Sequence, residues 1–236
     1  MSEIKLNDLK IETPFRGFIS GPSGAGKSAF ILRFLENRTK LCTNTFEKVI
    51  YCSLINLESL SAKDESFLSE LKNRVPYIEI YSGLPTLSEL IESPHKGTLL
   101  ILDDLITDVI GSEKYAKLFT SFSAHSNISV LTTSQNFFEQ GKYATTIIRN
   151  QTFYVLFFSR NDNQTINVIS KRMFPHDKHF LRNCFHWINE RVTEQFKKYI
   201  FIDCSNNTKL PPTFPQVRTN MFNECNFFSP LFLCPE

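Results

Sequence analysis

The stretch Gly21-Pro22-Ser23-Gly24-Ala25-Gly26-Lys27-Ser28 matches the pattern G-x-x-x-x-G-K-[ST] of a phosphate-binding loop, the P-loop. The chain has only eight glycines, and half of them, Gly17, Gly21, Gly24 and Gly26, lie in or just before this stretch. Glycine lets backbone N–H groups approach an anion without interference from a Cβ atom. We therefore expect the loop to hold the phosphates of a nucleoside triphosphate, with Lys27 at the β- and γ-phosphates and the Ser28 hydroxyl on Mg²⁺.

The sequence on either side of the loop has the pattern that a P-loop needs. Phe15–Ser20 is typical of a short strand, and apolar residues recur at helical spacing from Lys27 to Asn37. The start of that helix adds N–H groups and positive potential at the phosphates. A strand, a glycine-rich loop and a helix in succession favour a functional P-loop over a chance match in a loop that contains glycine.

The rest of the chain alternates between expected strands and expected helices. Several of the strands are almost continuously apolar, as buried parallel strands are. This alternation predicts an α/β fold, a three-layer sandwich with a largely parallel central sheet. The further expected strands are Lys48–Cys52, Tyr77–Tyr81, Thr98–Leu102, Ile128–Thr132, Phe153–Phe158 and Tyr199–Asp203, and the further expected helices are Ser66–Asn73, Thr86–Glu92, Glu113–Ser123, Asn163–Met173 and Lys178–Glu194.

This pattern divides the chain of 236 residues into three parts. Residues 1–14 are expected to form an N-terminal arm, and residues 15–204 a single P-loop ATPase domain, a size that one core can serve. Residues 205–236 lose the periodicity and gather Asn, Pro and Phe. We expect them to form a C-terminal tail without a core of its own, which docks on the domain or on a neighbouring chain.

Composition and charge narrow the class of protein. Hydrophobic residues make up 42% and charged residues 21% of the chain, as in an ordinary globular protein, and a net charge of +2 gives no argument for nucleic-acid binding by itself. The six cysteines show no metal-binding spacing, so we expect them to be reduced, in a reducing intracellular compartment. The sequence has no signal-peptide pattern and no apolar run of about 20 residues, and we expect no membrane partner.

A buried strand that ends in two carboxylates, Thr98-Leu99-Leu100-Ile101-Leu102-Asp103-Asp104, has the pattern of a Walker B strand. A carboxylate at the end of a strand near the P-loop can hold Mg²⁺ together with Ser28, and we assign this role to Asp103, acting through water. Asp104 is then placed to orient or deprotonate the attacking water. The alternative is that the two aspartates only end the strand and cap the segment that follows.

The expected strand Ile128–Thr132 runs into polar residues that include Gln135. If this strand lies between the P-loop strand and the Walker B strand, a side chain at its end can reach the γ-phosphate or the attacking water, and Gln135 is the best candidate. The alternative is a Gln-Asn pair that starts a helix in a surface loop. We expect His125, shortly upstream, to be structural.

Transfer of a phosphoryl group often needs an arginine, supplied by the same chain or by a neighbour. The candidates are Arg149, Arg160 and Arg172. The sequence does not choose between them, and for each one the alternative is a solvated surface arginine.

Three stretches carry a resemblance to a known family. They are GPSGAGKS at residues 21–28, TLLILDDL at residues 98–105 and HSNISVLTTSQNFF at residues 125–138. This succession resembles that of the FtsK/HerA-type genome-packaging ATPases, most of all those of Maverick/Polinton elements and adintovirus-like DNA viruses. The likeness runs from about Pro14 to Asp203. The DDL strand followed by N-[IL]-S-V and QN-x-F is more specific than the P-loop, which many families share.

The resemblance implies an additional-strand P-loop fold of the RecA and FtsK/HerA kind, and an ATP-driven motor that translocates double-stranded DNA into a preformed capsid. It implies ATP and Mg²⁺ as ligands. It also implies double-stranded DNA, a homo-oligomeric ring and a capsid protein as partners, in the host nucleus, the cytoplasm or the virion. Lys27, Ser28, Asp103, Asp104 and Gln135 map onto the family's positions.

Two departures concern the arginine that completes the family's site. Where the family tends to read R-T-[IL], this chain has Lys142-Tyr143-Ala144-Thr145-Thr146-Ile147, and where the family tends to read P-R-D, it has Arg160-Asn161-Asp162. Arg149 or Arg160 can substitute. If neither does, the chain is a nucleotide-dependent assembly or switch protein, a degenerate ATPase. A P-loop kinase is a further alternative, although the sequence shows no compact arginine-rich lid.

Overall fold

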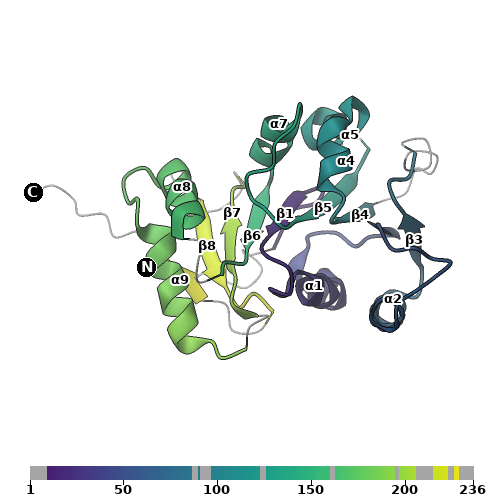
Figure 1. Ribbon diagram of the computed structural model, residues 1–236, viewed down its shortest axis with the longest axis horizontal. Coiled ribbons are helices and arrows are strands. Elements are labelled where there is room, and N and C mark those ends of the chain that lie inside the picture. The colour runs from purple at the N-terminus through teal and green to yellow at the C-terminus, as the bar shows by residue number, and fades with distance from the viewer. Residues whose placement is uncertain are drawn as a thin grey trace, which may run out of the picture.

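The central element of the protein is one mixed β-sheet with helices on both of its faces (Figure 1). The computed structural model describes residues 10–86, 90, 97–122, 126–159, 163–194, 197–205, 215–222 and 226–228. Within these described residues the sheet has nine strands, in the order β3-β2-β4-β5-β1-β6-β7-β8-β9. The strands are β1 (Arg16–Ser20), β2 (Lys48–Ser53), β3 (Ile78–Ser82), β4 (Thr98–Asp103), β5 (Ile128–Ser134), β6 (Phe153–Leu156), β7 (Ile200–Asp203), β8 (Gln216–Thr219) and β9 (Asn226–Phe228).

The pairing of the strands confirms the predicted fold class. The strands from β3 to β6 in this order are parallel to their neighbours, and β7, β8 and β9 continue the sheet with antiparallel pairs. Every strand that the sequence predicts is present. β5 lies between the P-loop strand β1 and the Walker B strand β4, so the fold is that of an additional-strand P-loop protein.

Helices cover the sheet in two layers, and each layer closes its own hydrophobic core. α1 and α2 pack on one face, where the core includes Phe34, Leu71 and Tyr51. The other helices pack on the opposite face, where the core includes Phe119 and Ile188 (Figure 1). The helices are α1 (Lys27–Leu41), α2 (Ala62–Arg74), α4 (Ile106–Gly111), α5 (Glu113–Lys117), α7 (Ala144–Arg149), α8 (Asn163–Met173) and α9 (Phe180–Arg191).

α1 begins at the end of the P-loop, and its buried face fixes the loop against the sheet. Phe30 and Phe34 are buried one helical turn apart, on the side that faces the sheet. Phe34 meets Phe15 edge-on, with ring centroids 5.8 Å apart, and Phe30 meets Tyr199 in the same way at 5.1 Å. These aromatic contacts therefore fix the helix against Phe15, which directly precedes β1, and against Tyr199, which directly precedes β7.

Several helices differ from their predicted bounds for local reasons. α2 begins before the predicted Ser66, because the Ser61 hydroxyl accepts a hydrogen bond from the Asp64 N–H and caps the helix. The predicted helix Glu113–Ser123 is α-helical only to Lys117, and the chain then kinks at Thr120, whose φ of −112° and ψ of −109° are not helical. α4 and α7 are short helices that the sequence did not predict. Most of the predicted helix Thr86–Glu92 lies outside the described residues.

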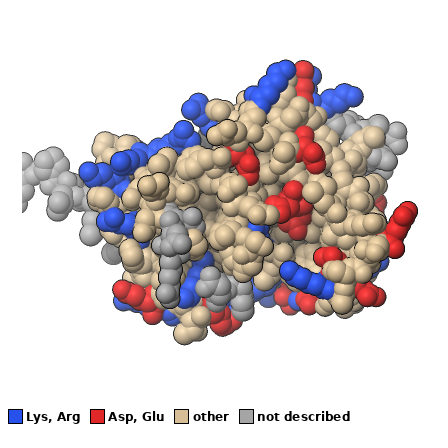
Figure 2. Space-filling view, in the orientation of Figure 1, with Lys and Arg blue, Asp and Glu red and all other residues tan. Residues whose placement is uncertain are grey.

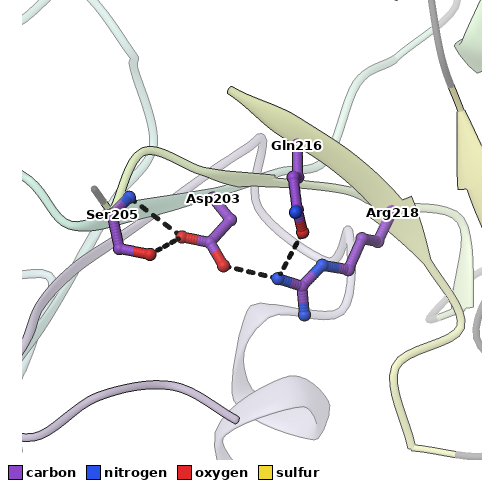
Figure 3. Close-up of polar contacts among 4 residues, drawn as sticks. All are labelled: Asp203, Ser205, Gln216 and Arg218. Carbon is purple, nitrogen blue, oxygen red and sulfur yellow. Dashed lines mark hydrogen bonds and ion pairs between the residues drawn. The ribbon is translucent and has the colours of Figure 1, made fainter. Parts of the chain in front are cut away.

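The sheet extends into residues 205–236, where the sequence predicted no strand. β8 pairs with β7, and β9 pairs with β8. Arg218 of β8 is 1% exposed and donates a hydrogen bond through Nη2 to Asp203 of β7 and another to Gln216 at 3.0 Å (Figure 3). Asp203 also accepts hydrogen bonds from the backbone N–H and the hydroxyl of Ser205. A buried ion pair thus joins β8 to the domain.

We expect Arg218→Ala to lower the free energy of unfolding by about 3–5 kcal/mol, because it leaves the buried Asp203 carboxylate without its counter-charge. Urea unfolding measures the change. The matched control is Arg191→Ala, which removes an exposed pair with Glu190, and it should cost at most about 1 kcal/mol. Equal losses of unfolding free energy in the two variants would show that the buried pair stabilises the fold no more than the exposed pair does.

The cysteine side chains of the described residues are free thiols. Burial raises the pKa of Cys42, Cys52, Cys184 and Cys204 to about 12, so very little thiolate exists at neutral pH and these thiols react slowly. Within the part of the chain that the structure describes, no helix has the length and apolar character needed to cross a membrane.

Candidate functional site: a P-loop beside a paired-aspartate edge

The P-loop has the backbone conformation that its glycines allow. Gly24 has φ 75° and Gly26 has φ 115°, backbone angles that residues with a Cβ atom rarely adopt. A Cβ atom on Gly21 would lie 2.5 Å from Cβ of Phe157, so close packing on the segment after β6 also excludes larger residues there. The loop runs directly into α1 at Lys27, and its N–H groups join those of the first helical turn.

Lys27 lies across the loop, where its ammonium group is bound by backbone oxygens. Its Nζ atom donates hydrogen bonds to the carbonyl groups of Gly21, at 2.7 Å, and of Pro22, at 3.2 Å. Burial lowers the pKa of Lys27, and the nearby carboxylates of Asp104 and Asp103 oppose that shift. The two aspartates that the sequence predicts for the same site therefore lie near enough to Lys27 to act on its charge.

Asp103 ends β4 with both of its carboxylate oxygens occupied. Oδ1 accepts a hydrogen bond from the Thr133 hydroxyl at 2.6 Å, and Oδ2 accepts one from the Tyr51 hydroxyl at 2.5 Å. Burial, followed by the charge of Asp103, raises the pKa of the Tyr51 phenol, which keeps it protonated as a donor. A carboxylate held in this way presents its remaining lone pairs to water, as expected of a metal-side residue that acts through water.

Asp104 and Gln135, which the sequence placed in one site, are in contact. Gln135 Nε2 donates a hydrogen bond to Asp104 Oδ2 at 2.8 Å. The Asp104 N–H donates to the Thr133 hydroxyl at 2.8 Å, so one threonine links both aspartates. Asp104 has φ 58°, an uncommon left-handed conformation that Asp and Asn tolerate better than most residues. Such strain often accompanies function.

The sequence reasoning did not single out Tyr51 and Thr133. Tyr51 leaves a signal in the sequence, because its hydroxyl is a polar group inside the apolar run VIYC at residues 49–52 and therefore needs a bonding partner. Thr133 leaves no such signal, because it is one of four Ser or Thr residues in β5. The partner is Asp103 in both cases. Only the sheet register, which brings Ser53 of β2 beside Asp103, shows that this partner is within reach.

The residues of this edge fit a nucleoside triphosphate with Mg²⁺. The described residues contain no group of three His, Cys, Asp or Glu side chains that could hold a metal by itself. Mg²⁺ usually takes one or two carboxylates together with substrate phosphates and water, and Asp103, with the exposed Ser28 in the first turn of α1, is such a donor set.

A pocket of about 230 Å³ adjoins the first half of the P-loop. It lies between the ends of β1, β5 and β6 and is lined by Gly21 and Ser23 of the loop, by Gln135, and by Thr165 of α8, among others. Lys27 and Ser28 do not line it. The pocket therefore extends the site from Gln135 toward α8, away from the start of α1.

The structure leaves the arginine of the site unassigned. Arg149 is exposed at the end of α7, and Arg172 is exposed on α8. Arg160 and His125 lie outside the described residues. Among the described residues, no arginine forms a hydrogen bond or an ion pair with Asp103, Asp104 or Gln135.

No protein-family profile matches the chain, and no curated protein matches it significantly. Solved structures do match. The genome packaging NTPase B204 of Sulfolobus turreted icosahedral virus 2, in complex with ATPγS, is 13% identical, with a TM-score of 0.50 over 93% of this chain and 98% of that chain. B204, the DNA-packaging ATPase of Sulfolobus turreted icosahedral virus, is 12% identical, with a TM-score of 0.51 over 94% and 100%. At this identity the likeness concerns the fold.

We expect Tyr51→Phe to weaken the apparent affinity for Mg²⁺ about tenfold, because it removes one of the two donors that fix the Asp103 carboxylate. A Mg²⁺ titration of nucleotide turnover measures the effect. Tyr77→Phe is the control, since the Tyr77 hydroxyl bonds to the Phe46 carbonyl, away from the site. An unchanged Mg²⁺ dependence in Tyr51→Phe would show that this hydrogen bond is only structural.

Proposed function

We propose that the chain is a P-loop ATPase, a hydrolase that uses ATP and Mg²⁺ to translocate double-stranded DNA and package a viral or virus-like genome. One observation carries the hydrolytic part of this proposal. The P-loop, with Lys27 bound across it, adjoins an edge where Thr133 bonds to both Asp103 and Asp104, and where Gln135 bonds to Asp104. NTP hydrolysis requires a loop that binds phosphate and, beside it, a carboxylate that can bind the attacking water.

Some residues of the site would neutralise charge on the phosphates, and others would position the attacking water. Lys27 would leave its two carbonyl partners and donate to the β- and γ-phosphates, and the loop N–H groups would hold the rest of the triphosphate. Ser28 and Asp103 would hold Mg²⁺, which would supply neutralisation of the developing phosphate charge. Asp104 would accept a proton from the attacking water, and Gln135, bonded to Asp104, would orient that water.

A second copy of the chain would supply the arginine. Since no described arginine of the chain bonds to the site residues, the positive charge that stabilises phosphoryl transfer would come from a neighbour in a homo-oligomeric ring. Arg149 and Arg172, both exposed, are the described candidates for that role.

Two observations support DNA as the partner and packaging as the task. The sequence resembles the packaging ATPases of Maverick/Polinton elements and adintovirus-like viruses from residue 14 to residue 203. The fold is similar to that of B204, which is described as a genome packaging NTPase and as a DNA-packaging ATPase. A capsid protein would be a further partner, in a virus-infected cell or the virion.

Phosphate release by the purified protein, with and without linear double-stranded DNA, tests the proposal. A motor should release phosphate faster when duplex DNA is present. A kinase would respond instead to a small acceptor, and an assembly switch would bind ATP and turn it over under neither condition. Tight ATP binding without release in both conditions would therefore reject the motor.

A further inference from the structure

The positive charge of the chain is concentrated on the helices α8 and α9, on the turn between them and on the short segment that follows α9. Residues 163–198 contain seven Lys or Arg and three Asp or Glu, a net charge of +4, whereas the whole chain has +2. All other residues together therefore carry −2. In Figure 2 basic side chains gather at the upper left, where Figure 1 places α8, and carboxylates are scarce there.

Four of these basic side chains are available to an outside partner. Lys171, Arg172 and Lys178 are exposed, Arg182 is half-buried, and none of the four forms an ion pair with a described residue. Arg191 and Lys197, by contrast, are paired with Glu190 and Glu194. We call the four unpaired residues, Lys171, Arg172, Lys178 and Arg182, the basic hairpin surface.

The nearest carboxylate does not cancel this surface. Asp177 lies in the turn between the helices, where it is half-buried and its Oδ1 accepts a hydrogen bond from the backbone N–H of His179. The exposed His176, His179 and His186 lie on the same hairpin and add donors. The exposed amides of Asn163, Gln164 and Asn183 do the same, and such groups bond to phosphate oxygens without reading sequence.

The dimensions suit a polyanion with closely spaced charges. α8 has 11 residues and α9 has 12, so each helix is about 16–18 Å long. Double-stranded DNA carries one charge per about 1.7 Å of its axis, so several phosphates face a surface of this length.

An anionic membrane is a poorer match for the same charges. Helices that bind in the membrane interface carry large apolar side chains beside the basic ones. Among the described residues, the most exposed large hydrophobic side chain on α8 or α9 is Val168, and Trp187 packs partly against the core. Leu54, Leu57 and Leu60, which are exposed, belong to the loop between β2 and α2.

We propose that the basic hairpin surface binds the backbone phosphates of double-stranded DNA. The choice of DNA rests on the proposed function, while the surface itself follows from the charges and their exposure. The surface shares helix α8 with the border of the nucleotide site. Thr165 of α8 lines the pocket that also borders Gly21 and Ser23 of the P-loop. DNA bound on α8 would thus contact the element that adjoins the phosphate loop.

Fluorescence anisotropy with a labelled duplex of mixed sequence, measured without nucleotide, tests the surface. The variant replaces all four residues by glutamine (Lys171→Gln, Arg172→Gln, Lys178→Gln, Arg182→Gln). The control removes the same charge from exposed lysines of α2 and α5 (Lys63→Gln, Lys72→Gln, Lys114→Gln, Lys117→Gln). Each phosphate contact contributes about 0.9 to the slope of log affinity against log salt, so loss of four contacts should reduce that slope by about 3.6.

We expect the hairpin variant to bind duplex at least tenfold more weakly at about 100 mM salt, and the control to keep the wild-type salt slope. Equal weakening in both variants would show that net charge alone acts, and would overturn the proposal, as would unchanged binding in the hairpin variant. Binding of the wild type to phosphatidylserine vesicles but not to duplex would overturn it in favour of a membrane. A variant that keeps Arg172 (Lys171→Gln, Lys178→Gln, Arg182→Gln) should hydrolyse ATP without DNA at the rate of the wild type and of the control variant, so loss of the motor function is distinguishable from loss of this surface.

Discussion

Lys27→Ala should lower the rate of ATP hydrolysis at least about 100-fold, as expected when a preorganised charged donor to a developing phosphate charge is removed. Lys27 is the lysine of the P-loop, and its Nζ atom already lies against the loop carbonyl groups of Gly21 and Pro22. Alanine at this position leaves the loop and the start of the helix in place but removes the ammonium group that would contact the β- and γ-phosphates. Steady-state phosphate release with saturating Mg²⁺ measures the loss.

Lys40→Ala is the matched control for this variant, because Lys40 lies in the last turn of the same helix and is exposed. It should keep wild-type turnover. Since Lys27 bonds only to loop carbonyls in the structure, its removal should leave the cooperative thermal transition in place, which separates loss of catalysis from loss of folding. A Lys27→Ala protein that hydrolyses ATP within a few-fold of the wild-type rate would contradict the assignment of the P-loop.

Asp104→Asn should lower turnover about 1000-fold while ATP still binds, because an amide cannot accept the proton of the attacking water. Asparagine is the suitable replacement, since Asp104 has φ 58° and Asn tolerates that conformation. The hydrogen bond with Gln135 can also persist, because the Gln135 amide can rotate to present its oxygen to the new NH₂ group. Binding of a fluorescent ATP analogue and phosphate release, measured on the same preparation, separate the two steps.

Asp108→Asn, on the exposed surface of α4, removes one carboxylate from the same region of the chain and should have no effect. If Asp104→Asn instead weakened binding and turnover in parallel, Asp104 would act on the ground state and the role of proton acceptor would pass to another group. If turnover were unchanged, the left-handed conformation of Asp104 would be a feature of the strand end alone.

The parallel part of the sheet is predictable from the sequence because a strand buried on both faces has to be apolar along its whole length. Residues 99–102 of β4 and Phe153–Leu156 of β6 illustrate this, since all of them are apolar or aromatic and buried. The P-loop is predictable for a related reason, since its glycines answer a backbone requirement that no other residue meets cheaply. The position of β5 between β1 and β4, which brings Gln135 to Asp104, follows from the resemblance and is present in the structure.

The parts that the sequence does not predict depend on partners far away in the chain. β8 reads Gln-Val-Arg-Thr, which looks like a surface segment until Asp203 is placed beside Arg218 (Figure 3). Tyr51 is a member of the site only through a hydrogen bond to a residue 52 positions later. The basic hairpin surface is equally hidden, because a net charge of +2 averages it with the acidic remainder of the chain.

Displacement of a third strand from a linear triplex reports movement along duplex DNA and therefore tests translocation itself. We expect the protein to release the third strand in the presence of ATP and Mg²⁺. We expect no release with ATPγS, and none with Lys27→Ala or Asp104→Asn. Phosphate release stimulated by duplex DNA, with the third strand still bound, would contradict a translocating motor and leave a DNA-dependent ATPase.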